Sequence, residues 1–394
     1  MTIVRSLRTH GLVPRLQPLR STIFAEMTAL AVRTGAVNLG QGFPDTDGPA
    51  GMLEAARSAI ASGHNQYPPG PGIPELRNAI AEQRAACYGL VHDPDTEVLV
   101  TVGATEAISA ALLALVGQGD EVLLIEPYYD SYPAAVALAG ATRRCVPLVA
   151  DGDRFTLDLD ALASAITPAT KALLLNSPHN PTGTVLRRCE LEALAALAVE
   201  HDLLVITDEV YEHLVFDGAP HLPIATFPGM AQRTLSVSSA GKTFSVTGWK
   251  IGWVCGPAHL VAAVRAVKQF LTFVGGAPLQ PAVAHALRAE HGWVAEHRAA
   301  LQGKQRRLAA GLHAAGFGVL RSEGTYFICA DIRPLGYCDG VEFCRDLPTR
   351  TGVVAIPVQV FVDDPPQWRH LVRFAFCKRN KVLDEAIARL QPRR

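Results

Sequence analysis

The middle of the chain alternates short apolar runs with longer segments rich in Ala and Leu. Between about residues 96 and 256, the apolar runs have the length and the β-branched content of strands. These predicted strands are 97–102, 121–125, 171–175, 203–207, 234–237 and 251–254. The segments between them, such as 104–116, 131–139 and 190–200, have the composition of helices. Continuous apolar strands separated by helices predict a mostly parallel sheet covered on both faces.

The pattern changes after about residue 290. A long helical stretch over 293–315 precedes predicted strands near 325–331, 353–356 and 371–377. This change predicts a second, smaller α+β domain, which part of the N-terminal segment joins. We therefore expect an α/β protein with a large domain over 46–287 and a small domain formed by 1–45 and 288–394.

Composition narrows the classes of protein that fit. The chain has 394 residues, of which 49% are hydrophobic and 19% charged, so a sizeable core is expected. A formal net charge of -1 supplies no overall field for nucleic acid or an acidic membrane, and every apolar run is too short to span a bilayer. The eight cysteines form no CxxC pair. They indicate free thiols in a reducing cytoplasm, with neither a disulfide framework nor a metal site.

The first 25 residues contain four arginines and no acidic residue. This composition resembles a transit peptide, but Gly11, Pro14 and Pro18 interrupt any amphipathic helix and no apolar signal core is present. We expect a mobile basic arm at the start of a soluble protein.

Polar residues follow the predicted strands at the points where those strands end. In open α/β sheets, ligands bind at the carboxyl ends of the strands. The residues that fall there are Gly103-Ala104-Thr105, Pro127-Tyr128-Tyr129, Asn176 to Pro181, Asp208 to Tyr211, and Lys242. Five polar groups at one predicted edge indicate a ligand site.

The segment 238–250 carries two lysines among small residues. Small side chains at 238–241 permit the close backbone approach that a Schiff-base lysine needs, which makes Lys242 the candidate nucleophile. Ser238, Ser239 and Lys250 are suited to hold a phosphate. The alternative is a strand end followed by a solvated loop with two surface lysines.

The other loops offer parts of a pyridoxal-phosphate site, each with a simpler alternative. Gly103-Ala104-Thr105 opens a helix whose amides can bind phosphate, or forms an ordinary strand-to-helix turn. Tyr129 can stack on a flat ring or seal the core. Asp208 ends an apolar strand and requires a cation, such as a protonated pyridine nitrogen. Asn180 and Tyr211 can bond the ring hydroxylate, although 176–181 is also rich in turn formers.

Arg373 lies within the apolar strand 371–376 and alternates with Val372, Phe374 and Phe376. An arginine on an otherwise apolar strand indicates a bidentate clamp for a carboxylate. A salt bridge at the rim of the protein is the alternative.

Together these motifs resemble a class I/II aminotransferase of pyridoxal-phosphate fold type I, over about residues 20–390. The resemblance rests on Ser239-x-x-Lys242 with Lys250, Asp208-x-x-Tyr211, Asn176-x-x-x-Asn180-Pro181-x-Gly183 and Arg373. The segments 38–45 (NLGQGFPD), 65–67 (NQY) and 355–357 (AIP) resemble the kynurenine/glutamine aminotransferase subgroup. Within it, the sequence is most similar to actinobacterial N-succinyldiaminopimelate aminotransferases.

The resemblance implies a seven-stranded sheet, pyridoxal 5'-phosphate as cofactor and a homodimer with shared active sites. It implies that Lys242 is catalytic, and that the phosphate is held by Ala104, Thr105, Ser239, Lys250 and, from the other subunit, Tyr67. It implies that Tyr129 stacks on the ring, that Asn180 and Tyr211 bond its hydroxyl, and that Asp208 pairs with its nitrogen. Gly42, Asn180 and Arg373 match the contacts to the substrate α-carboxylate.

Two positions depart from kynurenine-preferring relatives. Phe24 stands where those relatives carry a tryptophan, and Val274 stands where they carry a histidine. Both differences alter the pocket for the substrate side chain.

The expected reaction is a ping-pong transfer of an amino group between glutamate/2-oxoglutarate and N-succinyl-LL-2,6-diaminopimelate. The alternatives keep the cofactor: a kynurenine, glutamine or methionine aminotransferase, or a cysteine-conjugate β-lyase. A DNA-binding regulator is disfavoured because the first 25 residues are too short for a DNA-binding domain. A nicotinamide dehydrogenase is disfavoured because no G-x-G-x-x-G follows the first strand of the large domain.

Overall fold

The computed structural model describes residues 13–19 and 22–391. Most of the predicted mobile arm therefore lies outside the described residues, apart from a 3-10 helix over Pro14–Leu19 and the start of α1 (Ile23–Thr34). Among the described residues, no helix combines the length and apolar character needed to cross a membrane.

The larger sheet has seven strands in the order β2-β10-β9-β8-β7-β3-β4. Neighbouring strands are parallel except at β10, which is antiparallel to both β2 and β9. This arrangement confirms the predicted mostly parallel sheet. The strands are β2 (Val98–Thr101), β3 (Glu121–Glu126), β4 (Thr142–Pro147), β7 (Thr170–Asn176), β8 (Leu204–Asp208), β9 (Thr234–Ser239) and β10 (Gly252–Cys255).

Helices cover both faces of this sheet because successive strand residues point to opposite sides. Leu124 packs in a cluster with residues of α4, α5 and α9, whereas its neighbour Leu123 packs with residues of α6 and α7. A third cluster joins β2 and β10 to α2, α3 and α10. These helices are α2 (Ala50–Ala61), α3 (Pro74–Tyr88), α4 (Gly103–Leu115), α5 (Ser131–Ala139), α6 (Leu159–Ala165), α7 (Arg188–Glu200), α9 (Ala258–Leu271) and α10 (Gln280–Ala289).

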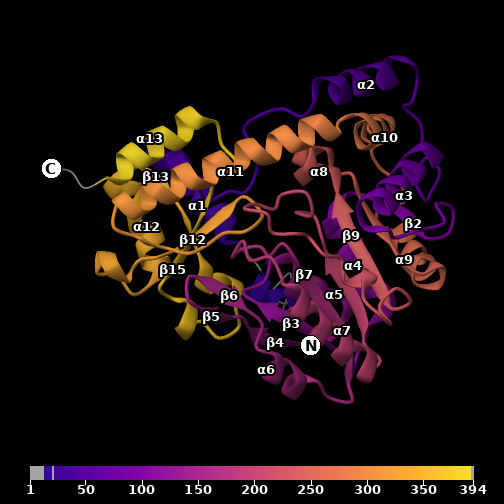
Figure 1. Ribbon diagram of the computed structural model, residues 1–394, viewed down its shortest axis with the longest axis horizontal. Coiled ribbons are helices and arrows are strands. Elements are labelled where there is room, and N and C mark those ends of the chain that lie inside the picture. Colours follow the sequence, from indigo (N-terminus) through magenta and orange to yellow (C-terminus); the bar gives the residue numbers. More distant parts are fainter. Residues whose placement is uncertain (1–12, 20–21, 392–394) are drawn as a thin grey trace, which may run out of the picture.

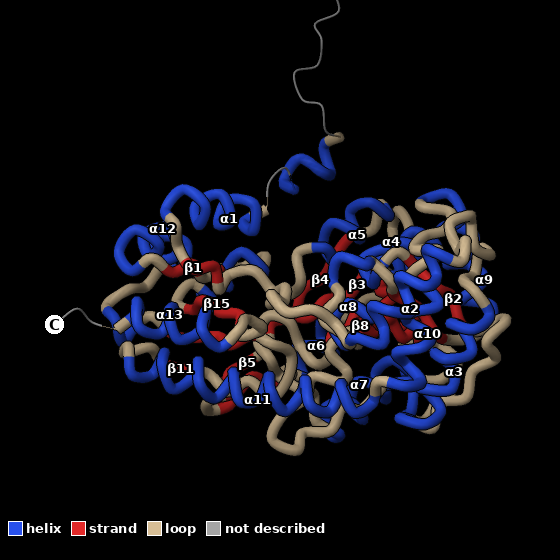
Figure 2. The backbone as a smooth tube through the Cα atoms, turned by 90° about the horizontal axis from the view of Figure 1, so that it is seen from above, coloured by secondary structure: helices blue, strands red, loops and turns tan. Residues whose placement is uncertain are grey.

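A smaller antiparallel sheet forms the second lobe, and the two sheets are seen apart in Figure 2. Its strands are β11 (Gly318–Val319), β12 (Phe327–Asp331), β15 (Leu371–Ala375) and β14 (Ile356–Pro357). Residues of α1, α11 (His291–Ala314), α12 (Gly340–Thr351) and α13 (Asn380–Leu390) share its core. Strand β1 (Val37–Asn38) pairs with β13 (Val353–Val354), so a segment near the N-terminus lies beside the C-terminal part of the chain. The domain boundaries at residues 46 and 288 stay a prediction.

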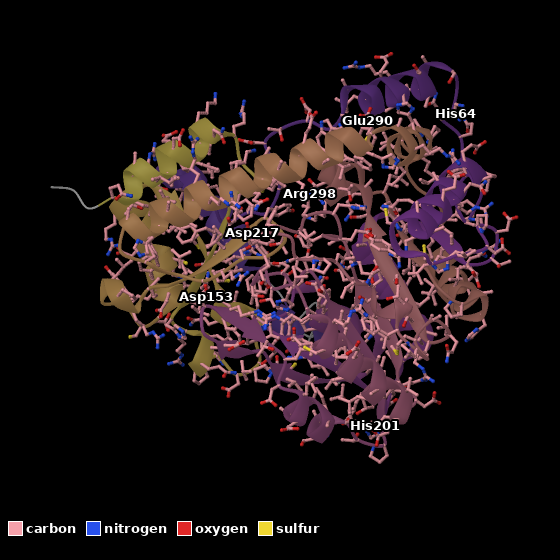
Figure 3. All side chains as sticks on the ribbon, in the orientation of Figure 1. His64, Asp153, His201, Asp217, Glu290 and Arg298 are labelled. Atoms are coloured by element: carbon pink, nitrogen blue, oxygen red, sulfur yellow. The ribbon has the colours of Figure 1, made fainter. Side chains whose placement is uncertain are left out.

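Helix α11 connects the two lobes. It begins after Glu290, beside α2 and α10, and runs toward α13 (Figures 1 and 3). The chain also forms a short hairpin of β5 (Val149–Asp151) and β6 (Arg154–Thr156), and the short helix α8 (Ala240–Thr243) follows β9 directly.

Strand register brings the predicted site residues to one edge of the large sheet. Asn176 lies opposite Asp208 at the carboxyl ends of β7 and β8, and Asp208 lies opposite Val237 of β9. Because β10 is antiparallel, its first residue, Gly252, pairs with the last residues of both β2 and β9. Lys250, which precedes β10, therefore lies at the same edge as the residues that follow β2 and β8.

Candidate active site

A cavity of about 280 Å³ lies at this edge of the sheet, against the smaller lobe. All but two of the candidate site residues named from the sequence line it. They are Phe24, Gly42, Ala104, Thr105, Tyr129, Asn180, Asp208, Tyr211, Ser239, Lys242, Lys250 and Arg373. One exception is Tyr67, which is 82% exposed and packs its ring edge-on against Phe273, with 5.4 Å between the ring centroids. The other is Ser238, which was expected to help hold a phosphate but lies outside the cavity, where its hydroxyl donates to Oε1 of Glu212.

Lys242 lies in α8, directly after β9, and its amine points into the cavity. Its Nζ donates a hydrogen bond of 2.9 Å to the Tyr326 hydroxyl, which in turn donates to the carbonyl oxygen of Gly42 at 2.5 Å. Loss of hydration lowers the pKa of Lys242 to about 8. A neutral, nucleophilic amine is therefore accessible near neutral pH. The position of Lys242 in α8, its place in the cavity lining and its bond to Tyr326 differ from the alternative of a lysine on a solvated loop.

Asp208 ends β8 and is buried. The Tyr132 hydroxyl donates to its Oδ2 at 2.7 Å, and the backbone N–H of Val210 donates to its Oδ1 at 3.2 Å. Burial raises the pKa of Asp208 to about 6, despite these hydrogen bonds. A carboxylate desolvated in this way favours a cationic partner in the cavity.

The start of α4 forms an anion cradle between β2 and β10. Gly103 has φ +75°, and a Cβ on it would lie 3.1 Å from Nζ of Lys250. A Cβ on Gly252 would lie 2.6 Å from the carbonyl carbon of Gly103, so only glycine permits β10 to approach this turn. The first residues of α4 line the cavity together with Ser239 and Lys250, and helix-terminal amides, hydroxyls and an amine are groups suited to phosphate.

Arg373 is buried at the cavity, with 1% of its surface exposed, so it is not the rim salt bridge considered above. Its Nη1 donates to Oδ1 of Asn180 at 2.8 Å and its Nη2 donates to the carbonyl oxygen of Gly40 at 3.0 Å. The Phe327 ring centroid lies 3.9 Å from its Cζ, a stacking that the absence of a side chain at Gly42 permits. Burial lowers the pKa of Arg373, and its Nε has no hydrogen-bond partner among the described residues. A buried cation with a free donor is a receptor for an anion.

Two tyrosines of the site were not predicted. Tyr132 lies three residues after Tyr129 at the start of α5, a spacing that places both on one side of a helical turn and could have revealed it. Tyr326 comes from the smaller lobe, and no spacing in the sequence relates it to Lys242.

Comparison with known proteins agrees with this geometry. The family model of class I and II aminotransferases matches residues 34–390. The probable N-succinyldiaminopimelate aminotransferase DapC of Mycobacterium tuberculosis (strain H37Rv) is 63% identical over 386 residues, covering 96% of this chain and 97% of that protein. Methionine aminotransferase of Escherichia coli K12 is 41% identical, covering 98% of this chain and 100% of that protein.

Comparison with solved structures also finds aminotransferases. The structure of N-succinyldiaminopimelate aminotransferase from Mycobacterium tuberculosis matches with a TM-score of 0.95 and 64% identity, covering 96% of this chain and 99% of that chain. Because the match covers nearly the whole chain, both lobes share the fold type I architecture. The chain therefore belongs to the class I and II aminotransferases, enzymes that use pyridoxal phosphate.

Proposed function

We propose that this transaminase moves an amino group between glutamate/2-oxoglutarate and N-succinyl-LL-2,6-diaminopimelate, on the route to diaminopimelate and lysine. The observation that supports this substrate assignment is the 63% identity to the mycobacterial DapC over nearly the whole chain. The eight free cysteines support placing the enzyme in a reducing cytoplasm.

The chemistry of the residues that line the cavity fits pyridoxal phosphate. The cradle at Gly103 and Gly252 would take the phosphate, together with Thr105, Ser239 and Lys250. The buried Asp208 carboxylate would pair with a protonated pyridine nitrogen, Tyr211 and Asn180 would bond the ring hydroxyl, and Tyr129 would stack on the ring. Lys242 would hold the cofactor covalently through Nζ.

We also propose a homodimer in which Tyr67 of the partner subunit reaches the phosphate. Tyr67 and Phe273 support this proposal, because they form an exposed aromatic pair on the surface.

When bound, the cofactor withdraws electron density from the substrate's α-carbon, so that an amino group can be exchanged for a keto group. The residues of the chain supply binding and proton transfer. Lys242 Nζ, with its lowered pKa, can take the proton that leaves the α-carbon and return it at neutral pH. Tyr326 fixes the direction of this amine through the hydrogen bond at 2.9 Å.

Arg373 and Asn180 would orient the substrate by its α-carboxylate. Because Oδ1 of Asn180 already accepts from Arg373, its Nδ2 is the donor that remains available. The Phe24 ring, 5.4 Å from Cζ of Arg373, borders the space for the substrate side chain. Substrates with a free α-carboxylate are therefore bound in one orientation.

A donor screen tests the proposal. N-succinyl-LL-diaminopimelate, kynurenine, methionine and glutamine are each supplied with 2-oxoglutarate, and kcat/KM is measured from the glutamate formed. Lys242→Ala provides the background rate. We expect the succinylated diamine to give the highest kcat/KM. Higher values for kynurenine, methionine or glutamine would refute the substrate assignment, and pyruvate release from a cysteine conjugate as the fastest reaction would favour the lyase.

A further inference from the structure

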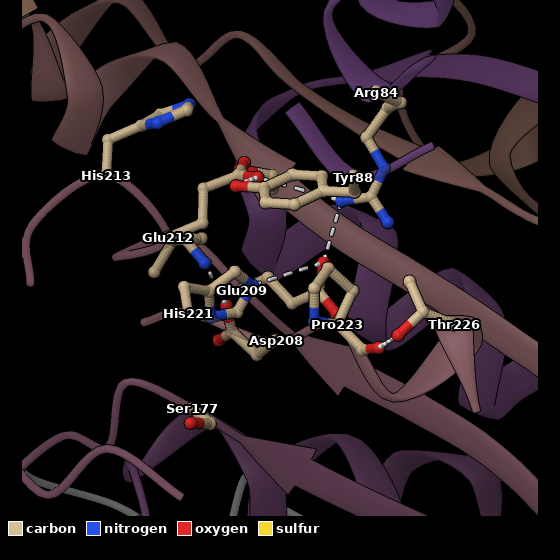
Figure 4. Close-up of polar contacts among 12 residues, drawn as sticks. Arg84, Tyr88, Ser177, Asp208, Glu209, Glu212, His213, His221, Pro223 and Thr226 are labelled. Atoms are coloured by element: carbon tan, nitrogen blue, oxygen red, sulfur yellow. Dashed lines mark hydrogen bonds and ion pairs between the residues drawn. The ribbon is translucent and has the colours of Figure 1, made fainter. Parts of the chain in front are cut away.

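A buried ionic cluster lies on the side of the site turned away from the cavity. It consists of Arg84 and Tyr88 of α3, Glu209 and Glu212 of the turn after β8, and His221, and Figure 4 shows these side chains gathered beside Asp208. None of the five lines the cavity. The chemistry proposed above gives them no role.

Arg84 is the cation of this cluster. Its Nη1 donates to Oε2 of Glu209 at 2.7 Å and lies 3.6 Å from Oε2 of Glu212, and no more than 1% of any of these side chains is exposed. The Tyr88 hydroxyl donates to the same oxygen of Glu212 at 2.7 Å. Atoms of Glu209, Glu212 and His221 come close enough together to suit a metal ion, but the Arg84 guanidinium already supplies a cation there. The cluster is therefore an ion-pair network, in which Nε and Nη2 of Arg84 and Oε1 of Glu209 have no hydrogen-bond partner among the described residues.

The cluster contacts two elements that also carry residues of the proposed cofactor site, on the side of each element that faces away from the cavity. In the turn after β8, Asp208 and Tyr211 face the cavity, whereas Glu209 and Glu212 face Arg84. In β9, Ser239 faces the cavity, whereas the Ser238 hydroxyl donates to Oε1 of Glu212 at 2.5 Å. Arg84 thus connects to the ends of both strands through the two glutamates.

We propose that Arg84 is a positioning residue for the cofactor: through Glu209 and Glu212 it sets where Asp208 and Ser239 meet the ring nitrogen and the phosphate. This inference rests on the roles proposed above for those two residues. A buried ion pair that loses one partner leaves an uncompensated charge, which the surrounding backbone must move to solvate. Here the backbone that would move is the turn directly after Asp208, which carries Glu209 and Glu212.

The loss of the Arg84 charge would also weaken cofactor binding through its effect on Asp208. The charge of Glu209 already raises the pKa of Asp208, in addition to the effect of burial. Without Arg84, that repulsion is no longer balanced, and the ionised form of Asp208 becomes less favourable.

The experiment compares Arg84→Gln with Arg77→Gln. Arg77 is a matched control because it is a buried arginine of the same helix, and its guanidinium bonds Asp95 at 2.7 Å and the carbonyl of Gly72 at 3.2 Å, outside the 208–212 turn. For each variant, the dissociation constant of pyridoxal phosphate is measured by titrating the apoprotein. The melting temperature of the apoprotein is recorded separately.

At about pH 5, one unit below the Asp208 pKa of about 6, we expect the dissociation constant of Arg84→Gln to exceed that of Arg77→Gln by about tenfold, the factor that one pKa unit on Asp208 represents there. Both variants should lower the melting temperature of the apoprotein. Equal dissociation constants in the two variants would overturn the proposal, because the effect would then be general loss of stability.

Two further variants keep the test decisive. If Arg84→Gln does not fold, Ser238→Ala takes its place, because it removes only the hydrogen bond between β9 and Glu212. It should weaken cofactor binding about threefold, the effect of one modest hydrogen bond. Unchanged binding would overturn the proposal. Asp208→Asn must weaken the binding of pyridoxal phosphate more than Arg84→Gln or Ser238→Ala does. If it does not, the site assignment fails, independently of Arg84.

Discussion

Replacing Tyr132 with Phe removes one hydrogen bond to Asp208 and keeps the buried ring. The lost donor lies 2.7 Å from Oδ2 of the carboxylate, and both side chains are buried. A hydrogen bond to a charged group contributes about 1.5–3 kcal/mol, which corresponds to about 1–2 pKa units. Because this donor stabilises the ionised carboxylate, its loss raises the pKa of Asp208 from about 6 to about 7–8 in the apoprotein.

The affinity for pyridoxal phosphate reports this change. Only ionised Asp208 pairs with a protonated ring nitrogen, so affinity falls as the pH drops through the pKa of Asp208 in the apoprotein. The dissociation constant is measured across a range of pH for the wild-type protein and for Tyr132→Phe. We expect the midpoint of the fall to lie at least about one pH unit higher in the variant.

Tyr128→Phe is the matched control. Its hydroxyl also donates to a carboxylate at 2.7 Å, but the acceptor is Asp363, outside the cavity. The reasoning is refuted if the midpoint of Tyr132→Phe equals that of the wild-type protein, or if Tyr128→Phe shifts it by the same amount.

Three other substitutions test separate contacts. Asp208→Asn should stabilise the apoprotein against urea by up to about 3 kcal/mol at neutral pH, because the folded-state pKa lies near 6 against an ordinary 3.8. That gain should vanish below about pH 4, where the carboxyl is protonated in both states; an equal gain at both pH values would contradict it. Arg373→Ala should raise KM for amino acid donors by at least about 30-fold, or about 2 kcal/mol, with cofactor affinity unchanged. Tyr326→Phe should lower the pKa of Lys242 below about 8, seen as faster acylation of the lysine near neutral pH.

The central strands were predictable because they are buried on both faces. Strands such as β7 and β9 consist almost entirely of buried residues, which leaves continuous apolar or small-residue runs in the sequence. Strand β4 was not predicted because it lies at the sheet edge and, among the described strands, pairs only with β3. Its first residues, Thr142, Arg143 and Arg144, are exposed, so no apolar pattern marks them.

The cavity residues were predictable where strand ends place them, and less so where other elements do. Asp208 and Lys242 each follow a buried strand, which gives them a position that the sequence reveals. Tyr326 reaches Lys242 from the smaller lobe, and Arg84 acts from α3 behind the sheet, so both depend on tertiary packing. The role of Tyr67 stays a prediction, since it requires a second subunit.

The most direct test of the site is to map where the cofactor attaches. The protein loaded with pyridoxal phosphate is reduced with borohydride, which makes the covalent link permanent, and its peptides are analysed by mass spectrometry. We predict that the added mass lies on Lys242, whose amine faces the cavity with a pKa of about 8. Added mass on Lys250 or on a lysine outside the cavity would contradict the proposed active site.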